Sequence, residues 1–321
     1  YDLRDDYLAM GFGEEETAEF DRVSTIEAIE GALRELGHDV ERVGHAKALV
    51  GRLAQGMRWD LVFNIAEGLR GVGREAQVPA LLEVYDIPYT FADPLVASLT
   101  LHKAMTKRVL RDLGVATTDF RVVEREADLD AVDLPFPLFV KPLAEGTAKG
   151  ITSTSRVTTR EELVREAMRQ VRELRQAVLV EPYLSGREFT VGITGTGDAA
   201  RALGTMEIVM KANAEPHAYT YVNKENSEEL GEFPLAPPEW AALAEELALR
   251  AWRGLGCRDA GRVDVRADDH GVLHVMELNP LAGLHPTHSD LPMIATATGV
   301  SFVELIGRIV ASAAERCTEA R

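Results

Sequence analysis

The segment GRVDVR (residues 261–266), followed after a short connection by VMELNP (residues 275–280), decides the fold of this chain. Polar and apolar residues alternate in both segments, which predicts two β-strands that each have one apolar and one polar face. The connection ADDHG (residues 267–271) is typical of a hairpin, so we expect the two strands to lie side by side. Their polar faces then bring together four side chains, Arg262, Asp264, Glu277 and Asn279.

Two carboxylates and an amide beside a guanidinium are a typical ligand set for Mg²⁺ that holds the phosphates of a nucleotide. The arginine would stabilise negative charge that develops during transfer. The alternative is a half-buried sheet with an internal ion pair, and these two strands alone leave that alternative open.

Length and composition limit the class of protein. The chain has 321 residues, enough for two or three modest domains, and its apolar (46%) and charged (27%) contents are those of a soluble globular protein. No apolar run is long enough to span a bilayer and no leader is evident, so we expect no membrane partner. The net charge of −17 argues against a nucleic-acid partner, because binding a polyanion requires a basic surface. The two cysteines, Cys257 and Cys317, are too few for a disulfide framework, and we expect a cytoplasmic location.

The order of the predicted elements indicates three parts and an α/β fold with an α+β centre. Residues 1–95 alternate strand and helix patterns, which predicts a domain with a parallel sheet. Residues 96–179 are predicted to form a small central α+β domain, and residues 180–321 a strand-rich C-terminal domain with the metal site. Strands are predicted at 38–43, 59–65, 88–90, 120–123, 137–142, 178–181, 188–194 and 203–209. Helices are predicted at 14–36, 78–84, 99–113, 160–174, 238–254 and 302–315.

A lysine ends one of these strands immediately before a loop of small residues. Lys141 precedes Pro142, and the loop EGTAKG follows at residues 145–150. Glycines allow the backbone to approach phosphate oxygens closely, and its N–H groups can hold an anion. The loop is not a Walker A sequence, and a surface hairpin with a solvated lysine remains an alternative. Lys103, on a predicted helix, is a weaker candidate for the same role.

Two carboxylates near the following strands are candidates for contact with a nucleoside. Glu181, in EPYL (residues 181–184), ends a buried strand, and Glu188 begins the next one. Such a segment can present backbone groups and an apolar side to a base while a carboxylate accepts from a ribose hydroxyl. Either glutamate could instead be a solubilising charge at a sheet edge.

A long irregular loop, NPLAGLHPTHSDLP (residues 279–292), follows the second of the metal-type strands and is well placed for substrate recognition. Its polar candidates are His285, His288 and Ser289. The two histidines could bind zinc, but no third ligand is evident. The motifs of serine hydrolases, zinc peptidases and nicotinamide dehydrogenases are missing, so these functions lack support.

Together and in this order, these segments resemble the ATP-grasp superfamily and, within it, the D-alanine–D-alanine ligases. The matching segments are VFNIAEG with REAQVPALLE and IPYT, then LHKAMTKRVL, FPLFVKPLAEGTAKG, VLVEPYLSGREFTV, GRVDV and MELNPLAGLHPTHSDLP. The resemblance covers nearly the whole chain. It implies an ATP-grasp fold of three domains in which the nucleotide lies between the central and C-terminal domains.

The resemblance also implies a role for each matching residue. Lys103 and Lys141 would contact the phosphates of ATP. The loop residues Glu145, Gly146 and Thr147 would close over them, with the Thr147 hydroxyl in place of a family serine. Glu181 and Leu184 would hold adenine, and Glu188 the ribose. Asp264, Glu277 and Asn279 would bind two Mg²⁺ ions, for which Mn²⁺ could substitute. Arg262 would stabilise a tetrahedral intermediate, and the second substrate would lie against Gly283, His285, His288 and Ser289.

The implied activity is that of an ATP-dependent carbon–nitrogen ligase that forms ADP. A carboxylate attacks the γ-phosphate of ATP, and an amine then displaces phosphate from the acyl phosphate. The partners would be small amino or hydroxy acids, and family members are commonly homodimers.

The chain departs from the family where the amino acids bind. Glu67 stands where the ligases carry a histidine, and Glu225 where their mobile loop supplies a tyrosine. The N-terminal glutamate that holds the first amino group has no clear match, although Glu19 and Glu27 lie nearby. We therefore expect altered specificity, with a cationic or amine-bearing first substrate. The alternatives are a true D-alanine–D-alanine ligase, an ATP-binding regulator that has lost ligation, and a kinase that stops at the acyl phosphate.

Overall fold

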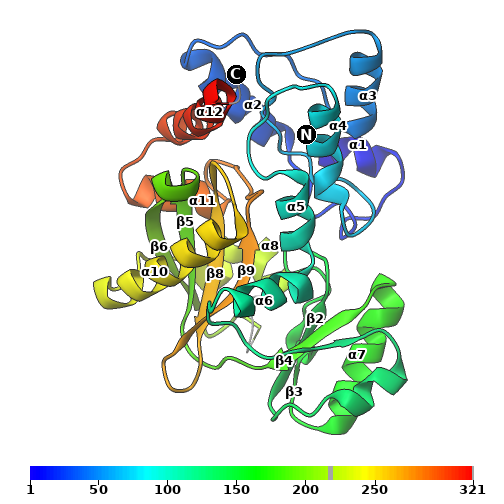
Figure 1. The fold of residues 1–321 in the computed structure, drawn as a ribbon. Coiled ribbons are helices and arrows are strands. Elements are labelled where there is room, and N and C mark those ends of the chain that lie inside the picture. The colour runs from blue at the N-terminus through cyan, green and yellow to red at the C-terminus, as the bar shows by residue number, and fades with distance from the viewer. Residues whose placement is uncertain (216–219, 320–321) are drawn as a thin grey trace.

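The computed structural model describes residues 1–215 and 220–319 of the chain. Two antiparallel sheets dominate it, one with the strand order β1-β4-β2-β3 and one with the order β7-β6-β5-β8-β9. An N-terminal part of helices and extended segments lies against the second sheet, and the C-terminal helix returns to this part (Figure 1). The arrangement confirms the predicted α/β fold with an α+β centre.

The N-terminal part differs most from its prediction. Its helices are α1 (Arg4–Ala9), α2 (Val23–Glu35), α3 (Ala46–Ala54), η1 (Arg74–Ala76) and α4 (Gln77–Val84). The predicted strand at 38–43 is wrong, because the carbonyl of Val40 accepts from the Arg34 side chain at 3.2 Å rather than from a neighbouring strand. At 59–65 and 88–90 the described residues form only the isolated parallel bridge Val62–Tyr89.

The helix predicted at 14–36 begins only at Val23. The backbone of Asp21 forms a parallel bridge with Leu3, in which the amide of Arg4 donates to the Asp21 carbonyl at 2.9 Å. Because this bridge requires an extended backbone, the helix cannot start before it. The bridge brings the segment around Glu19 and Asp21 toward the centre of the molecule.

The helix predicted at 99–113 is two helices, α5 (Pro94–Leu101) and α6 (Lys103–Asp112), with a break at His102. The imidazole of His102 accepts from the amide of Met105 at 3.3 Å and so caps α6. The break also frees the amide of Lys103, which donates to the carbonyl of Leu143 at 3.1 Å. Lys103 is therefore held next to the end of the central sheet.

The central sheet carries one amphipathic helix. Its elements are β1 (Arg121–Val123), η2 (Glu126–Ala131), β2 (Leu138–Pro142), η3 (Ser153–Ser155), β3 (Arg156–Val157), α7 (Arg160–Leu174) and β4 (Val178–Pro182). Residues such as Val140 and Val180 pack fully buried against Leu163 and Ala167 of α7. The strands β1, β2 and β4 and the helix α7 agree closely with the sequence prediction, because each of these strands contains a short apolar run and the helix has a clear apolar stripe. The short elements η2, η3 and β3 were not predicted.

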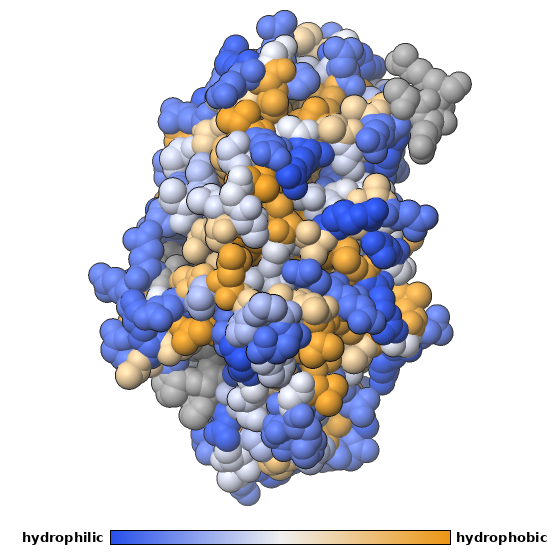
Figure 2. All heavy atoms as spheres, turned by 90° about the vertical axis from the view of Figure 1, so that its left-hand side faces the viewer, coloured by the Kyte–Doolittle hydropathy of each residue, from blue (hydrophilic) through white to orange (hydrophobic). Residues whose placement is uncertain are grey.

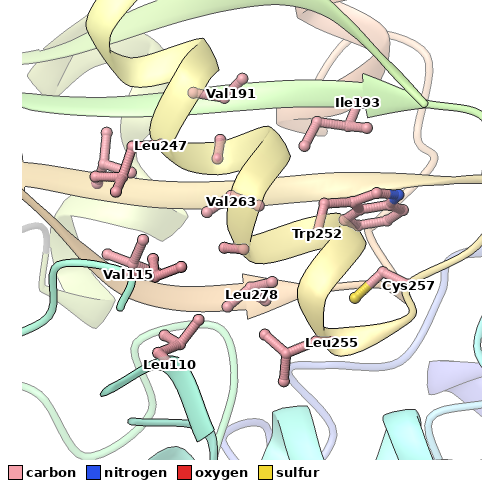
Figure 3. Close-up of a cluster of buried hydrophobic side chains, with 14 of the residues drawn as sticks. Leu110, Val115, Val191, Ile193, Leu247, Trp252, Leu255, Cys257, Val263 and Leu278 are labelled. Atoms are coloured by element: carbon pink, nitrogen blue, oxygen red, sulfur yellow. The ribbon is translucent and has the colours of Figure 1, made fainter. Parts of the chain in front are cut away.

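The C-terminal sheet is covered on its apolar face by α10. The elements of this part are β5 (Glu188–Thr194), η4 (Gly197–Ala199), β6 (Arg201–Met210), α8 (Tyr221–Glu225), α9 (Ser227–Leu230), β7 (Gly231–Glu232), α10 (Pro238–Leu255), β8 (Ala260–Ala267), β9 (Leu273–Asn279), α11 (Asp290–Ala297) and α12 (Phe302–Glu319). Trp252 of α10 is fully buried on this face among Ile193, Val263 and Leu278 (Figure 3). Gly261 is required there, because a Cβ at this position would lie 2.6 Å from the Trp252 ring.

The opposite face of this sheet carries polar residues in rows that cross the strands. In the antiparallel register, Thr190 of β5 pairs with Asp264 of β8, and Asp264 pairs with Glu277 of β9. One step along the sheet, Arg262 pairs with Asn279. The hairpin predicted from the sequence is therefore confirmed, and its four polar side chains share one face.

The outer surface is mostly hydrophilic. Figure 2 shows the face that lies on the left in Figure 1, where apolar side chains are interspersed among hydrophilic ones. In the described ranges no single helix is long and apolar enough to cross a membrane; the bent pair α11 and α12, at 113°, passes by length and composition alone.

Candidate active site

Two cavities meet at the polar face of the C-terminal sheet. The smaller, of about 110 Å³, lies between the two sheets; we call it the inter-sheet cavity, and it is lined by residues such as Lys141, Leu184, Glu188 and Thr190. The larger, of about 450 Å³, reaches the N-terminal part; we call it the N-terminal cavity. Six residues line both and form a shared wall: Lys103, Glu145, Lys224, Arg262, Glu277 and Asp290.

Arg262 lines both cavities as part of this shared wall. Its guanidinium forms an ion pair with Asp264 and lies 3.4 Å from an oxygen of Asp290. Across the wall, the ammonium of Lys103 lies 3.5 Å from a carboxylate oxygen of Glu277. A cation at this place faces both cavities, so it can act on a group that passes from one to the other.

The residues predicted as metal ligands fit a hard divalent cation. The amide nitrogen of Asn279 donates to Oδ2 of Asp264 at 3.2 Å, while Oδ1 of Asp264 is buried without a hydrogen-bond partner among the described residues. Two carboxylates and an amide oxygen are the donors that Mg²⁺ prefers. The described residues contain no group of three or more His, Cys, Asp or Glu placed to hold a metal alone, so phosphate and water would complete the set.

The two carboxylates of this pair differ in their pKa values. Burial, with the nearby Glu277, raises the pKa of Asp264 to about 6 even though Arg262 opposes the shift. Burial alone would raise the pKa of Glu277, but Lys103, Arg262 and further cations lower it to about 2. The two groups therefore differ in charge near neutral pH, with Glu277 ionised and Asp264 easier to protonate.

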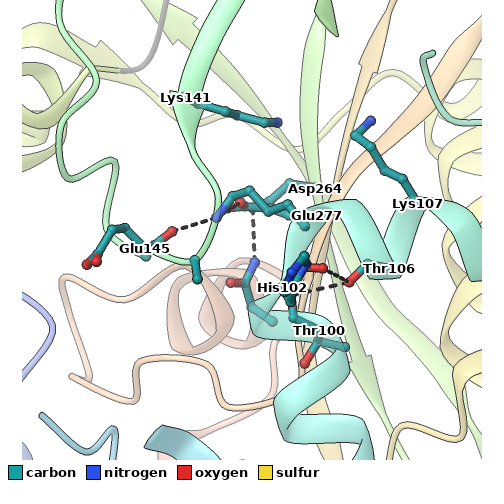
Figure 4. A network of polar contacts seen from close by, with 12 residues as sticks. Thr100, His102, Thr106, Lys107, Lys141, Glu145, Asp264 and Glu277 are labelled. Carbon is teal, nitrogen blue, oxygen red and sulfur yellow. Dashed lines mark hydrogen bonds and ion pairs between the residues drawn. The ribbon is translucent and has the colours of Figure 1, made fainter. Parts of the chain in front are cut away.

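Lys141 enters the inter-sheet cavity from the end of β2. Its ammonium lies 2.6 Å from Glu181, which also receives Lys107 at 2.8 Å and the Thr118 hydroxyl at 2.7 Å. Figure 4 shows Lys141 and Lys107 approaching each other from β2 and α6, with Asp264 and Glu277 close by. The carboxylate of Glu181 is thus held by two lysines and a hydroxyl.

The loop predicted to hold phosphates borders the shared wall. Thr147 and Ala148 both have left-handed backbones, with φ of 49° and 54°, a strained arrangement typical of functional loops. The amide of Gly146 donates to the Glu19 carboxylate at 2.5 Å, and a Cβ at Gly146 would lie 2.9 Å from that oxygen. Lys103 donates to the carbonyl of Glu145 at 2.5 Å. The loop is therefore tied both to α6 and to the N-terminal part.

One wall of the N-terminal cavity is acidic. It is formed by Glu19, Asp21, Glu67 and Glu75. One nitrogen of Arg74 contacts both carboxylate oxygens of Glu19, at 2.9 and 3.1 Å, and lies 3.9 Å from Glu145, while another nitrogen donates to the carbonyl of Ala144. Burial and the neighbouring carboxylates raise the pKa of Glu67, while burial raises the pKa of Glu75 and of Asp21 to about 7 in each case. Four acidic side chains are therefore gathered on one side of the cavity.

The loop after β9 forms the opposite wall of the same cavity. The Ser289 hydroxyl accepts from the amide of His285 at 2.9 Å, and a Cβ at Gly283 would lie 2.8 Å from this oxygen. The His285 and His288 rings are 4.5 Å apart, and His288 pairs with Glu228 at 2.9 Å. All four predicted second-substrate residues line the cavity. Glu225 in α8 was also predicted to contact a substrate, but its side chain lies outside the described part of the chain.

Several residues of the site were not predicted. Lys224 and Asp290 belong to the shared wall, and Lys107 completes the pair around Glu181. Burial and Arg262 lower the pKa of Lys224. All three residues lie in helices, where the sequence pattern does not mark them as part of a site. Only their closeness in the sequence to a predicted site residue could have indicated them: Lys107 is one turn from Lys103, Lys224 precedes Glu225, and Asp290 follows Ser289.

The raised pKa of Glu75 predicts a pH-dependent effect on stability. A carboxylate whose pKa rises from 4.5 to about 7 on folding weakens the folded state as the pH increases through that range. Glu75→Gln should therefore raise the free energy of unfolding at pH 8 by about 1–3 kcal/mol, and should have little effect below pH 5. Urea unfolding at both pH values, without ligands, measures this. Glu27→Gln, on the exposed side of α2, is the control, and an equal gain at both pH values would contradict the account.

Comparisons with known proteins agree with this geometry. A family model described as the D-ala D-ala ligase C-terminus matches residues 109–311. The chain is 37% identical over 260 residues to the D-alanine–D-alanine ligase of Bordetella petrii, covering 80% of this chain and 76% of that one. It is 31% identical to the ligase of Aquifex aeolicus, covering 90% and 94%. The crystal structure of the Bacillus anthracis ligase complexed with ATP superposes with a TM-score of 0.73 at 22% identity, covering 93% and 94%.

The fold and the site define an ATP-grasp protein, in which a small cavity lies between two sheets beside a carboxylate pair. Given the extent of these matches, the chain belongs to the D-alanine–D-alanine ligase family. This confirms the predicted superfamily and the predicted class of ATP-dependent carbon–nitrogen ligase.

Proposed function

We propose that this enzyme joins the carboxylate of a cationic or amine-bearing first substrate to the amine of a second amino acid. The observation that carries the proposal is the shared wall, where Arg262 separates a lysine-lined cavity from one with an acidic wall. The small inter-sheet cavity is suited to phosphates and the larger one to two small acids. The three domains would comprise residues 1–95, 96–179 and 180–321. We also expect a cytoplasmic location and a homodimer.

The nucleotide would lie with its phosphates against Lys141, Lys103 and the N–H groups of loop 145–150. The backbone of residues 181–184 would hold adenine, and Glu188 the ribose. Mg²⁺ bound by Asp264, Glu277 and Asn279 would offset the negative charge of the phosphates. The unpartnered Oδ1 of Asp264 supports this ligand set, because a buried carboxylate oxygen is costly without a donor or a cation.

The first substrate would bind with its positive charge at Glu67 and Glu75 and its carboxylate toward the shared wall. There the carboxylate oxygen attacks the γ-phosphorus, and ADP leaves. The amine of the second substrate, whose own carboxylate lies near Ser289, then attacks the acyl carbon. Arg262 stabilises the tetrahedral oxyanion before the phosphate departs. Each ATP consumed thus gives one amide bond, one ADP and one phosphate.

The acidic wall predicts the choice of first substrate. The wild-type enzyme should use D- or L-amino acids with a second amino group at least about 10-fold better, in kcat/KM, than alanine, because an ion pair in a half-buried site contributes about 1.5–3 kcal/mol. Glu67→Gln should remove most of this preference while retaining activity with alanine. Phosphate release, measured across an amino-acid panel, tests the prediction.

The control and the pH profile separate this account from a general loss of activity. Glu27→Gln, outside both cavities, should keep the wild-type preference. The KM of the cationic substrate should fall as the pH rises through about 7, where Glu75 ionises, and that of alanine should change less. If the wild-type enzyme prefers D-alanine over every cationic amino acid, the proposed specificity is wrong and the enzyme is a true D-alanine–D-alanine ligase.

A further inference from the structure

Thr190, in the middle of β5, carries a buried hydroxyl that no other feature of the fold explains. The residue is 2% exposed, and its Oγ1 has no hydrogen-bond partner among the described residues. Leaving such a group unpaired costs about 1–3 kcal/mol, and a valine of the same shape would avoid the cost. The hydroxyl therefore indicates a partner that binds there.

The position of Thr190 identifies that partner. Its Cα pairs in register with Asp264, and Asp264 with Glu277, so the three side chains form one row across three neighbouring strands. All three line the inter-sheet cavity. Oδ1 of Asp264 is the second buried atom without a partner in this row. Two unpaired polar atoms on adjacent strands face the same small cavity.

The hydroxyl of Thr190 and Oδ1 of Asp264 differ in the hydrogen bonds that they can form. A carboxylate oxygen can only accept or ligate, whereas a threonine hydroxyl can donate and accept. Mg²⁺ keeps several of its water molecules in protein sites, and their hydrogens need acceptors. A hydroxyl beside a ligating carboxylate can supply one.

We propose that Thr190 is a positioning residue of the metal site, whose hydroxyl accepts a hydrogen bond from a metal-bound water next to Asp264. The inference rests on the proposed function, since it requires the metal site. Partners of this kind typically change metal affinity by about 10–100-fold.

Mn²⁺ binding in the presence of a non-hydrolysable ATP analogue, followed by the electron paramagnetic resonance of free Mn²⁺, tests the proposal. Thr190→Val should weaken Mn²⁺ binding about 10-fold or more, and Thr190→Ser should bind like the wild type. Without metal and nucleotide, Thr190→Val should be at least as heat-stable as the wild type, because it removes an unpaired buried hydroxyl.

Two further variants make the outcomes distinguishable. Thr205→Val on β6 is the matched control, because its hydroxyl already donates to Glu245 at 3.1 Å; it should lose stability and keep Mn²⁺ affinity. Asp264→Asn should abolish tight Mn²⁺ binding. If Asp264→Asn fails to do so, the proposed metal site is wrong. If Asp264→Asn abolishes binding while Thr190→Val binds normally or is destabilised without metal, only the role of Thr190 is overturned.

Discussion

Arg262→Lys is expected to lower kcat by about 10²–10³-fold while the protein stays folded. Lysine keeps the positive charge, but it cannot contact Asp264 and Asp290 with separate nitrogens as the guanidinium does. The loss of a fixed donor to a developing oxyanion typically has an effect of this size. Steady-state kinetics at saturating ATP, with the melting temperature measured in parallel, give the result.

Arg187→Lys is the matched control for this variant. Arg187 also pairs with a carboxylate, Glu207, at 2.5 Å, but it lies outside both cavities. Its kcat should stay within about 2-fold of the wild type, as is usual for a substitution away from the site. A kcat for Arg262→Lys within about 3-fold of the wild type would show that the shared wall is not where the oxyanion forms.

Arg316→Met is expected to cost about 3–5 kcal/mol of unfolding free energy. Arg316 of α12 forms an ion pair with Asp259, whose side chain is fully buried and also accepts from the amide of Phe91 at 2.7 Å. A second nitrogen of Arg316 donates to the carbonyl of Tyr89 at 3.1 Å. Removing the guanidinium leaves the buried negative charge of Asp259 without a cation to balance it. Urea unfolding measures the resulting loss of unfolding free energy.

A double variant and a surface variant separate this cause from a general effect of the substitution. Arg316→Met with Asp259→Asn should recover part of the loss, because the unpaired charge is gone and asparagine tolerates the φ of 64° at this position. Arg34→Met, which breaks an exposed pair with Glu30, should cost less than about 1 kcal/mol. A loss of the same small size for Arg316→Met would show that the junction between α12 and the N-terminal part is not stabilising.

The metal-type hairpin could be predicted because its information is local. A period of two places Arg262 and Asp264 on one face, and a short connection brings the next strand alongside, but the register shift after Asp264 is not visible in the pattern. The helix at 160–174 was predicted to the residue for the same reason, since its apolar stripe repeats at the helical period.

The N-terminal part could not be predicted equally well, because its structure depends on distant partners. The bridge from Leu3 to Asp21 delays the start of α2, and the carbonyl of Leu143 holds the break at His102. Neither partner is visible in the local pattern. Residues 38–43 alternate like a strand, but none of the strands in the described part of the chain pairs with them.

The acidic wall shows the same limit within the site. Glu67 was singled out from its departure from the family, but Asp21 joins it only through the folding of a separate segment, and the local pattern does not mark Glu75 as part of the site. Glu19 was noted only as lying nearby, yet it contacts both Arg74 and the phosphate loop. The assignment of each predicted residue to a ligand remains a prediction.

The central claim is that ATP drives the condensation of a cationic first substrate with a second amino acid. Mass spectrometry of the products formed from ATP, Mg²⁺ and a mixture of D- and L-amino acids, diamino acids included, tests it most directly. The account predicts a dipeptide that contains a diamino acid, formed together with one ADP per peptide bond. ADP formation with a hydroxylamine-trapped acyl phosphate and no peptide, or D-alanyl-D-alanine as the sole product, would contradict it.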